Sequence, residues 1–391
     1  MKNSLLLLFI FCSFEALFSQ NLTLSNQAEI SVLTVGPGNN LSDAFGHSAF
    51  RIKDRALNLD VTYGYGEYDF DAPNFYLKFA QGKLNYLISE TNFNRFYLIY
   101  RDYYNRSLKE QVLNLKQHQK QALYNYLVNN YKPENRAYLY DFFFDNCATK
   151  IKDVAQKNTN NNIVFNLPND YNDATFRNLI QENLNRNSWG SLGIDIALGS
   201  VIDQKATPEE QMFLPKNIHL FFENATINNG EPLVKKSHLL FDKMPTKSSD
   251  SFVVSPLFVL GIISLFIIFI TYKNYKNKTQ SKWLDISLFV ITGLVGIFIL
   301  LLWFATDHQS THNNYNLLWA FALNMFVIGQ FFKKKINAWF KNYIKFLIIM
   351  LCLLTLHWII GVQVFAIGLI PLLIALMVRY IFLIQHYSNK N

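Results

Sequence analysis

The chain has 391 residues, of which 50% are hydrophobic and 16% charged. A composition this apolar excludes two ordinary soluble domains and indicates that part of the chain lies in a membrane. The net charge of +8 does not indicate a nucleic-acid-binding protein, because the basic residues are concentrated at the C-terminal end. From residue 252 onward there are eleven Lys or Arg against two Asp, a net charge of +9, which leaves the preceding part at about −1.

The first residues have the pattern of a secretory signal peptide. Lys2 precedes an apolar stretch from Leu5 to Phe11, and Leu17-Phe18-Ser19 resembles a cleavage site. We therefore expect residues 1–19 to be removed and a domain of about residues 20–242 to be exported.

Three cysteines occur in the chain. Cys12 lies in the expected signal peptide and Cys352 in an apolar run, so Cys147 is the one thiol expected in the exported domain. An intradomain disulfide is therefore excluded. A lone thiol in an oxidising compartment is either buried and inert or retained for chemistry.

The exported domain begins with strand patterns and continues with helical ones. Alternating and β-branched residues predict strands at 29–35, 47–52 and 60–65. Apolar spacing predicts helices at 74–79, 93–100 and 117–131. Asp145 and Asn146 are helix-capping residues and predict a helix that begins near Cys147. The expected fold class is therefore α+β.

The C-terminal part predicts an all-α transmembrane bundle of about five helices. A linker of Pro, Ser and Lys at 243–251 precedes apolar runs at about 252–272, 284–305, 316–332, 344–360 and 362–384. The loops 273–283 and 333–343 are rich in lysine and are expected to be cytoplasmic, whereas 306–315 has no Lys or Arg. The exported domain and loop 306–315 are thus expected on the outer side of the cytoplasmic membrane.

Cys147 and His47 are the candidate catalytic pair. The first turn of a helix stabilises a thiolate, which favours a nucleophilic role for Cys147. The alternative is that Cys147 is a small buried residue that fills a gap between helix and sheet. A thiol nucleophile needs a base, and His47 begins a strand directly after Gly46, where its imidazole can be held rigidly. The other histidines of the exported domain, His118, His219 and His238, have no such setting.

A third group should orient the imidazole. Acidic, phenolic and amide side chains near the two candidates are Asp60, Tyr63, Tyr65, Asp69, Asp71, Asp145 and Asn146. Turns and aromatic packing explain several of them equally well, and the pattern does not rank them.

The outer loop TDHQSTHNNYN carries Asp307, His308 and His312. We expect this loop to contact a lipid headgroup or the exported domain rather than a metal ion. No metal and no cofactor are predicted for this chain.

The motifs FGHSAFRI and YLYDFFFDNCATKI place a strand histidine before a helix-start cysteine. This order resembles the circularly permuted papain-like enzymes, which include the NlpC/P60-related and lecithin:retinol acyltransferase-like groups. These enzymes use a cysteine nucleophile and a histidine base on amides, esters and lipids.

A closer resemblance extends over about residues 28–225. The motifs GHSAFRI, YGYGEYDFDAPNFYLKFAQGKLNY, PENRAYLYDFFFDNCATKI, GIDIALG and EEQMFLP are similar to the Lnb-type lipoprotein N-acyltransferase family. This resemblance implies a periplasmic, permuted NlpC/P60-like domain in which Cys147 takes an acyl chain from a membrane phospholipid. The acceptor would be the N-terminal amine of a diacylglyceryl-cysteine lipoprotein. Gly64 departs from the family pattern, which is expected to have asparagine there.

Two other functions remain open at this stage. A peptidoglycan amidase or endopeptidase of the NlpC/P60 type would use the same Cys and His, but would need no multi-span bundle. A non-catalytic membrane sensor would need no activated thiol.

Overall fold

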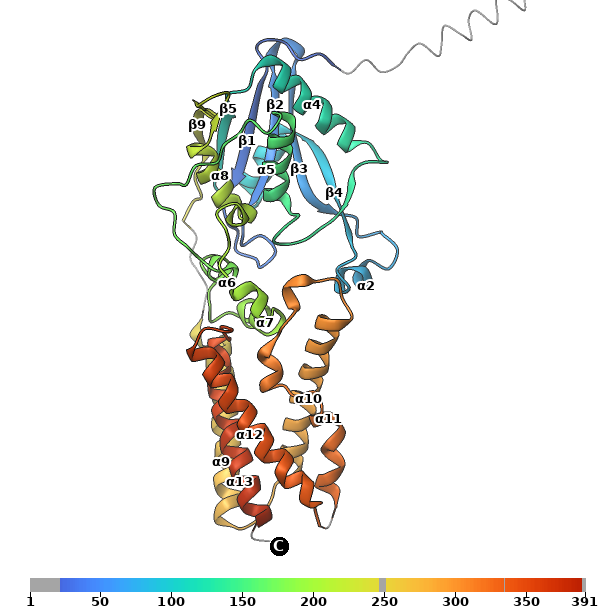
Figure 1. Cartoon of the computed structure of the whole chain (residues 1–391), viewed down its shortest axis with the longest axis vertical. Coiled ribbons are helices and arrows are strands. Elements are labelled where there is room, and N and C mark those ends of the chain that lie inside the picture. Colours follow the sequence, from blue (N-terminus) through green and yellow to red (C-terminus); the bar gives the residue numbers. More distant parts are fainter. Residues whose placement is uncertain (1–21, 246–250, 334, 389–391) are drawn as a thin grey trace, which may run out of the picture.

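The structure is a computed structural model that describes residues 22–245, 251–333 and 335–388. The expected signal peptide lies outside the described residues, and so do residues 246–250 of the predicted linker. A sheet domain stands above a bundle of long helices, with the short helices α6 (Phe176–Gln181) and α7 (Trp189–Ala197) between them (Figure 1). This arrangement agrees with the predicted α+β layout followed by a helical membrane part.

The sheet domain is built on seven antiparallel strands in the order β6-β4-β3-β2-β1-β5-β9. The three predicted strands form its centre as β1 (Glu29–Val35), β2 (His47–Asp54) and β3 (Leu59–Tyr68). The flanking strands, which were not predicted, are β4 (Asn85–Asn92), β5 (Leu108–Leu113), β6 (Ala137–Leu139) and β9 (Val234–Phe241). A separate two-stranded sheet pairs β7 (Thr226–Ile227) with β8 (Glu231–Pro232).

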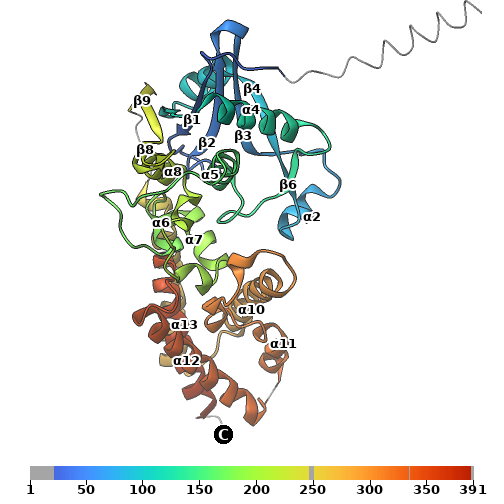
Figure 2. The ribbon, with the colours of Figure 1, turned by 45° about the horizontal axis from the view of Figure 1, so that its top comes forward.

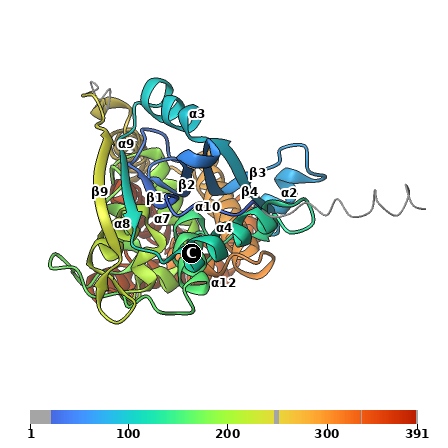
Figure 3. The same ribbon diagram turned by 90° about the horizontal axis from the view of Figure 1, so that it is seen from above.

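Helices cover both faces of the sheet (Figure 3). One face packs against α4 (Gln117–Tyr131), α5 (Cys147–Asn158) and α8 (Pro215–Asn224), and the other packs against α3 (Phe93–Leu98). Side chains of β1 alternate between the two cores, Ile30 and Val32 in the larger one and Leu33 and Val35 in the smaller one. Each fully buried aliphatic side chain of this kind contributes about 1.5–3 kcal/mol to folding.

Helix α5 begins at Cys147, as predicted. The Asn146 side chain accepts hydrogen bonds from the backbone N–H groups of Ala148 (2.7 Å) and Thr149 (3.0 Å). The Thr149 hydroxyl in turn accepts from the Asn146 N–H at 2.8 Å, which completes a capping box. Ile151 of the same helix is buried in the main core. This combination fixes Cys147 in the first turn, beside the start of β2.

The bundle contains four long apolar helices among the described residues. They are α9 (Pro256–Lys276), α10 (Lys282–Phe304), α12 (Ala338–Ile359) and α13 (Ile370–Ser388). Each is long and apolar enough to cross a membrane. The turn between α9 and α10 lies at the end of the bundle far from the sheet domain (Figure 1).

The predicted continuous helix at 316–332 does not form. The segment consists of short 3₁₀ turns and the four-residue helix α11 (Asn324–Val327), and it runs back along α10. Side chains at Gly293 and Gly296 would collide with its backbone, so the approach is very close. The buried Asn324 side chain donates to Thr292 at 2.8 Å. Irregular backbone at this depth is tolerated because one side of it packs on α10 and short-range turn bonds, such as Asn324 N–H to the Phe321 carbonyl, satisfy backbone polar groups.

The sheet domain and the bundle meet through a buried polar junction. Arg177 of α6, only 1% exposed, forms ion pairs with Asp195 and Asp203 at 2.8 Å each. From the bundle, the backbone N–H of Val364 donates to Asp203 at 3.2 Å, and the Asn316 side chain donates to the Asp195 carbonyl at 2.8 Å. These bonds hold the sheet domain in one orientation on the bundle.

Candidate active site

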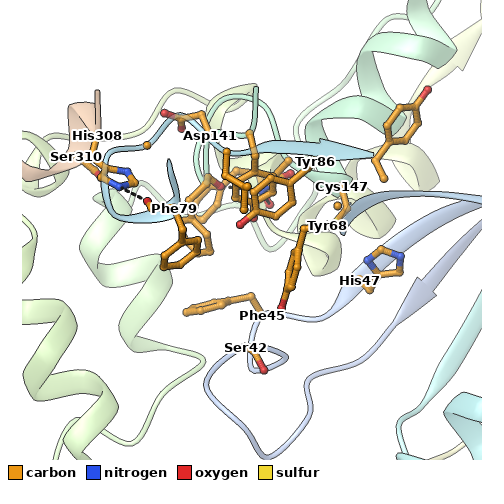
Figure 4. A pocket seen from close by; sticks show the side chains of 18 of the residues that line it. Ser42, Phe45, His47, Tyr68, Phe79, Tyr86, Asp141, Cys147, His308 and Ser310 are labelled. Carbon is orange, nitrogen blue, oxygen red and sulfur yellow. Dashed lines mark hydrogen bonds between the residues drawn. The ribbon is translucent and has the colours of Figure 1, made fainter. Parts of the chain in front are cut away.

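A cavity of about 470 Å³ lies where the sheet domain meets the outer loop of the bundle. His47 and Cys147 line one end of it, and His308 and Ser310 line the other (Figure 4). Aromatic side chains lie between the two ends, among them Phe45, Tyr68, Phe79, Tyr86, Tyr140 and Phe142. The cavity therefore connects the two predicted catalytic residues with the predicted outer loop.

The Cys147 thiol is half-buried at the first turn of α5. Burial raises the pKa of this thiol, while the backbone N–H groups of Ser48, Cys147 and Ala148 act in the opposite direction. Ser48 directly follows His47, so the sulfur faces the start of β2. At neutral pH the resting group is a thiol, and a base must take its proton before it can attack.

His47 is the first residue of β2 and is paired with Val35 of β1. Its ring stacks on Tyr100, with 6.4 Å between the ring centroids and an interplanar angle of 22°. The Arg106 guanidinium lies 5.2 Å from the centroid of the same tyrosine ring. Burial, and then the positive charge of Arg106, lower the pKa of His47 to about 4. The imidazole is therefore neutral at pH 7, the form that a general base requires.

Strand β3 has a glycine beside each of the two candidate residues. A β-carbon added at Gly64 would lie 3.2 Å from His47 Nε2, and one added at Gly66 would lie 3.9 Å from the Cys147 β-carbon. Gly66 also has a φ of +104°, which side chains disfavour. Gly66 lines the cavity beside the thiol, whereas Gly64 is buried and leaves room for the imidazole. In the described structure no hydrogen bond joins the two side chains directly.

The candidate third groups on β3 do not contact His47. The pairing of β2 with β3 places Asp60 opposite Lys53, near the far end of the strand, where it binds Arg51 at 2.7 Å. Tyr65 lines the cavity, but its hydroxyl donates to Asn130 at 2.7 Å. The Tyr63 hydroxyl donates to Glu90 at 2.5 Å.

The remaining candidates have structural partners as well. Asp69 and Asp71 are exposed beyond the end of β3, where the Asp69 side chain accepts from the Asp71 N–H at 2.9 Å. Asp145 forms an ion pair with Lys150 at 2.6 Å, and Asn146 caps α5. Of these four, Asn146 lines the cavity and holds Cys147 in place through the helix start.

Three contacts of the pair were missed by the sequence reasoning. Tyr100 and Arg106 surround His47 from the segment between α3 and β5, and the Ser48 N–H faces the thiol. Tyr100 was predicted as the last residue of a helix, but α3 ends at Leu98 and Tyr100 lies in the π-helical turn that follows, a change the sequence pattern did not indicate. The Ser48 N–H is a backbone group, so its position near the thiol cannot be inferred from the residue type.

The outer loop contacts the sheet domain, as expected for Asp307 and His308. The Asp307 N–H donates to the Gln81 carbonyl at 2.8 Å, and His308 Nε2 lies 3.2 Å from the Phe79 carbonyl. His312 is not at the cavity, because its carbonyl packs tightly against Gly199. Within the described ranges no group of three or more His, Cys, Asp or Glu is placed to hold a metal ion.

Two family descriptions match the chain. The Lnb N-terminal periplasmic domain matches residues 16–182, which include both His47 and Cys147. The Lnb transmembrane domain matches residues 247–391, which include the outer loop. Comparison with curated proteins and with solved structures found no match, and the permuted papain-like relationship stays a prediction. The chain therefore belongs to the Lnb family of membrane-anchored proteins with a periplasmic N-terminal domain.

Proposed function

We propose that this protein is a thiol acyltransferase of the cytoplasmic membrane, which moves an acyl chain from a phospholipid to the N-terminal amine of a diacylglyceryl-cysteine lipoprotein. The observation that carries the proposal is the shared cavity. It has a cysteine at a helix start and a neutral histidine at one end, and the outer loop of the membrane bundle at the other. The phospholipid donor and the lipoprotein acceptor are proposed because the motifs around His47 and Cys147 resemble those of lipoprotein N-acyltransferases.

The first half-reaction forms a thioester on Cys147. His47 accepts the thiol proton as the sulfur attacks the ester carbonyl carbon of the phospholipid. The carbon–oxygen ester bond then breaks, and the lysophospholipid oxygen leaves with the proton from the imidazolium. The N–H groups of Ser48, Cys147 and Ala148 face the sulfur and favour the thiolate form that attacks.

The second half-reaction transfers the acyl group to nitrogen. The lipoprotein amine attacks the thioester carbonyl, the carbon–sulfur bond breaks, and an amide forms. His47 takes the excess proton from the attacking nitrogen and returns it to the Cys147 sulfur. The neutral imidazole favoured by burial and by Arg106 suits this role, because it is ready to accept a proton in each half-reaction.

The bundle favours acyl transfer over peptidoglycan cleavage. His308 and Ser310 of the outer loop form part of the cavity wall, so the membrane part contributes to the site rather than serving only as an anchor. Both proposed substrates lie in the outer leaflet, and confinement to the same surface raises their effective concentration at the thiol. A permuted papain-like origin of the sheet domain agrees with the His-before-Cys order.

The proposal is tested with the full-length protein in lipid nanodiscs containing phospholipid and a diacylglyceryl-cysteine peptide. We expect wild type and a Cys352→Ala control to produce N-acylated peptide, and to form a hydroxylamine-sensitive acyl adduct on the peptide fragment that contains Cys147. Cys147→Ala should form neither product, as judged by mass spectrometry. Equal N-acylation by Cys147→Ala would falsify the thioester route. Release of muropeptides from purified cell wall by the wild type would instead favour the amidase alternative.

A further inference from the structure

The segment between β3 and β4 forms an apolar flap outside the cores of the molecule. We define the flap as residues 68–84, which include α2 (Phe75–Ala80). Phe75 is buried within the flap itself, where its ring lies 4.9 Å from Phe70 and 5.7 Å from Tyr68. None of the described core clusters includes a residue from 68–83. Residues 68–83 therefore do not belong to the packed interior of the sheet domain.

The outward face of the flap is strongly apolar. Three large side chains of the flap that do not line the cavity are exposed, namely Phe70, Tyr76 and Leu77, and Tyr76 reaches 81%. Scattered exposed apolar residues are ordinary, but three large ones within residues 70–77 form a patch that water solvates poorly. Such a patch marks a surface that binds a partner.

The position of the flap identifies this partner. Its backbone is joined to the loop that follows α10 through Asp307 and His308. Gly82, with a φ of +71°, lies close to His308, since a β-carbon added there would be 3.1 Å from His308 Nδ1. Helix α10 ends three residues before Asp307, at Phe304, which is 72% exposed. Figures 1 and 2 both place α2 beside the upper end of α10. The flap is thus level with the outer end of a membrane-spanning helix.

We propose that the exposed face of the flap inserts into the outer-leaflet interface of the bilayer that holds the bundle. Tyrosine and phenylalanine are favoured at this depth, where an amphipathic ring contacts both headgroups and acyl chains. The lipid surface continues directly from the exposed apolar side chains of α10, so no separate protein partner is needed to cover the patch. Insertion removes Phe70, Tyr76 and Leu77 from water.

The same segment also forms one wall of the cavity. Tyr68, Phe79 and Gly82 line the cavity, and Phe79 stands between Cys147 and the outer loop (Figure 4). An acyl chain that leaves the bilayer beside the flap therefore passes the aromatic lining on its way to the thiol. This guiding role rests on the proposed acyl transfer, whereas the contact between flap and lipid does not.

The contact is tested by measuring the depth of a nitroxide spin label on the flap. Leu77→Cys is labelled in full-length protein that carries Cys147→Ala and Cys352→Ser, in nanodiscs of phosphatidylethanolamine and phosphatidylglycerol. Leu57→Cys, in the exposed turn between β2 and β3 at the far end of the sheet, reports aqueous surroundings. Phe304→Cys reports the end of α10. Relaxation by oxygen, which concentrates in lipid, is compared with relaxation by a water-soluble nickel complex.

We expect the oxygen-to-nickel ratio at Leu77 to be close to that at Phe304 and several-fold above that at Leu57. A ratio nearer to that of Leu57 would overturn the proposal. Tyr76→Cys serves as a second labelling site if the first variant does not fold. Because the background lacks the Cys147 thiol, the depth measurement gives the same answer whether or not the protein transfers acyl chains, and failure of one proposal is distinguishable from failure of the other.

Discussion

The two ends of the cavity are built in different ways. At the sheet end, His47 lies on a central strand and Cys147 on a capped helix, and both belong to regular elements packed around the main core. At the membrane end, Phe79 lies on a six-residue helix and His308 on a loop, and few bonds join them. The sheet end is rigid because packing holds it, whereas the membrane end depends on the junction with the bundle.

This difference suits the two ends of the cavity to different tasks, the sheet end to chemistry and the membrane end to substrate access. Reacting groups need positions held to within a fraction of an ångström, which strands and helices provide. In the proposed reaction, a wall that admits flexible acyl chains needs less precision and more apolar surface. Substitutions at the sheet end should therefore change the rate of the chemical step, and those at the membrane end or junction should change stability or the use of bilayer substrates.

The largest effect is expected at the sheet end. His47→Gln removes the base that must deprotonate a thiol with a raised pKa, and the acylation rate should fall by about 10²–10⁴-fold. Single-turnover acylation, followed by mass spectrometry, measures this rate. His118→Gln on α4 is the matched control and should behave like the wild type. A similar loss in both variants would contradict the assignment of the base.

The junction should show the next largest effect, on stability. Arg177→Met leaves Asp195 and Asp203 buried without their cation, and breaking such a buried pair costs about 3–5 kcal/mol. The exposed pair of Lys205 with Asp173 provides the control Lys205→Met, which should have little effect. Thermal unfolding in nanodiscs compares the two variants. An unchanged midpoint for Arg177→Met would show that the junction does not hold the membrane end in place.

The pH profile sharpens the description of the sheet end. Since the pKa of His47 is lowered to about 4, the base stays neutral as the pH falls from 7 toward 5. Protonation then removes the base, and the rate should fall about tenfold per pH unit below pH 4. Initial rates of Cys147 acylation across this range locate the acid limb. A limb near 6.5 would mean that burial and Arg106 do not shift the imidazole.

The smallest effect is expected at the membrane end. His308→Ala removes one contact to the Phe79 carbonyl, a single bond worth about 0.5–1.5 kcal/mol. We expect transfer from bilayer phospholipid to fall about twofold to tenfold, while alkylation of Cys147 by iodoacetamide keeps its wild-type rate. His238→Ala, on the exposed edge strand β9, is the control. Slower alkylation in His308→Ala would show that the two ends are coupled more tightly than their contacts indicate.

Local patterns were sufficient wherever neighbouring residues decide the structure. Alternation predicted the three central strands, the spacing before Pro133 predicted α4 with its observed bounds, and Asn146 predicted the start of α5. Their physical basis lies within a few residues: side-chain period, proline geometry and helix capping. The same holds for the apolar runs that became α9, α10, α12 and α13, because bilayer thickness sets their length.

Long-range packing decided the rest. The run at 316–332 is apolar enough for a helix, but its buried Asn324 and the close approach to Gly293 favour irregular turns. Asp60 was a reasonable third group until strand register placed it beside Arg51. Tyr100 lay in a predicted helix, but its stacking on His47 joins distant residues and was not indicated by the sequence. By itself, the sequence determined the central strands, the long helices and the membrane part, and it singled out Cys147 and His47 as candidates. Only the tertiary structure decided what surrounds them, because those contacts join residues far apart in the chain.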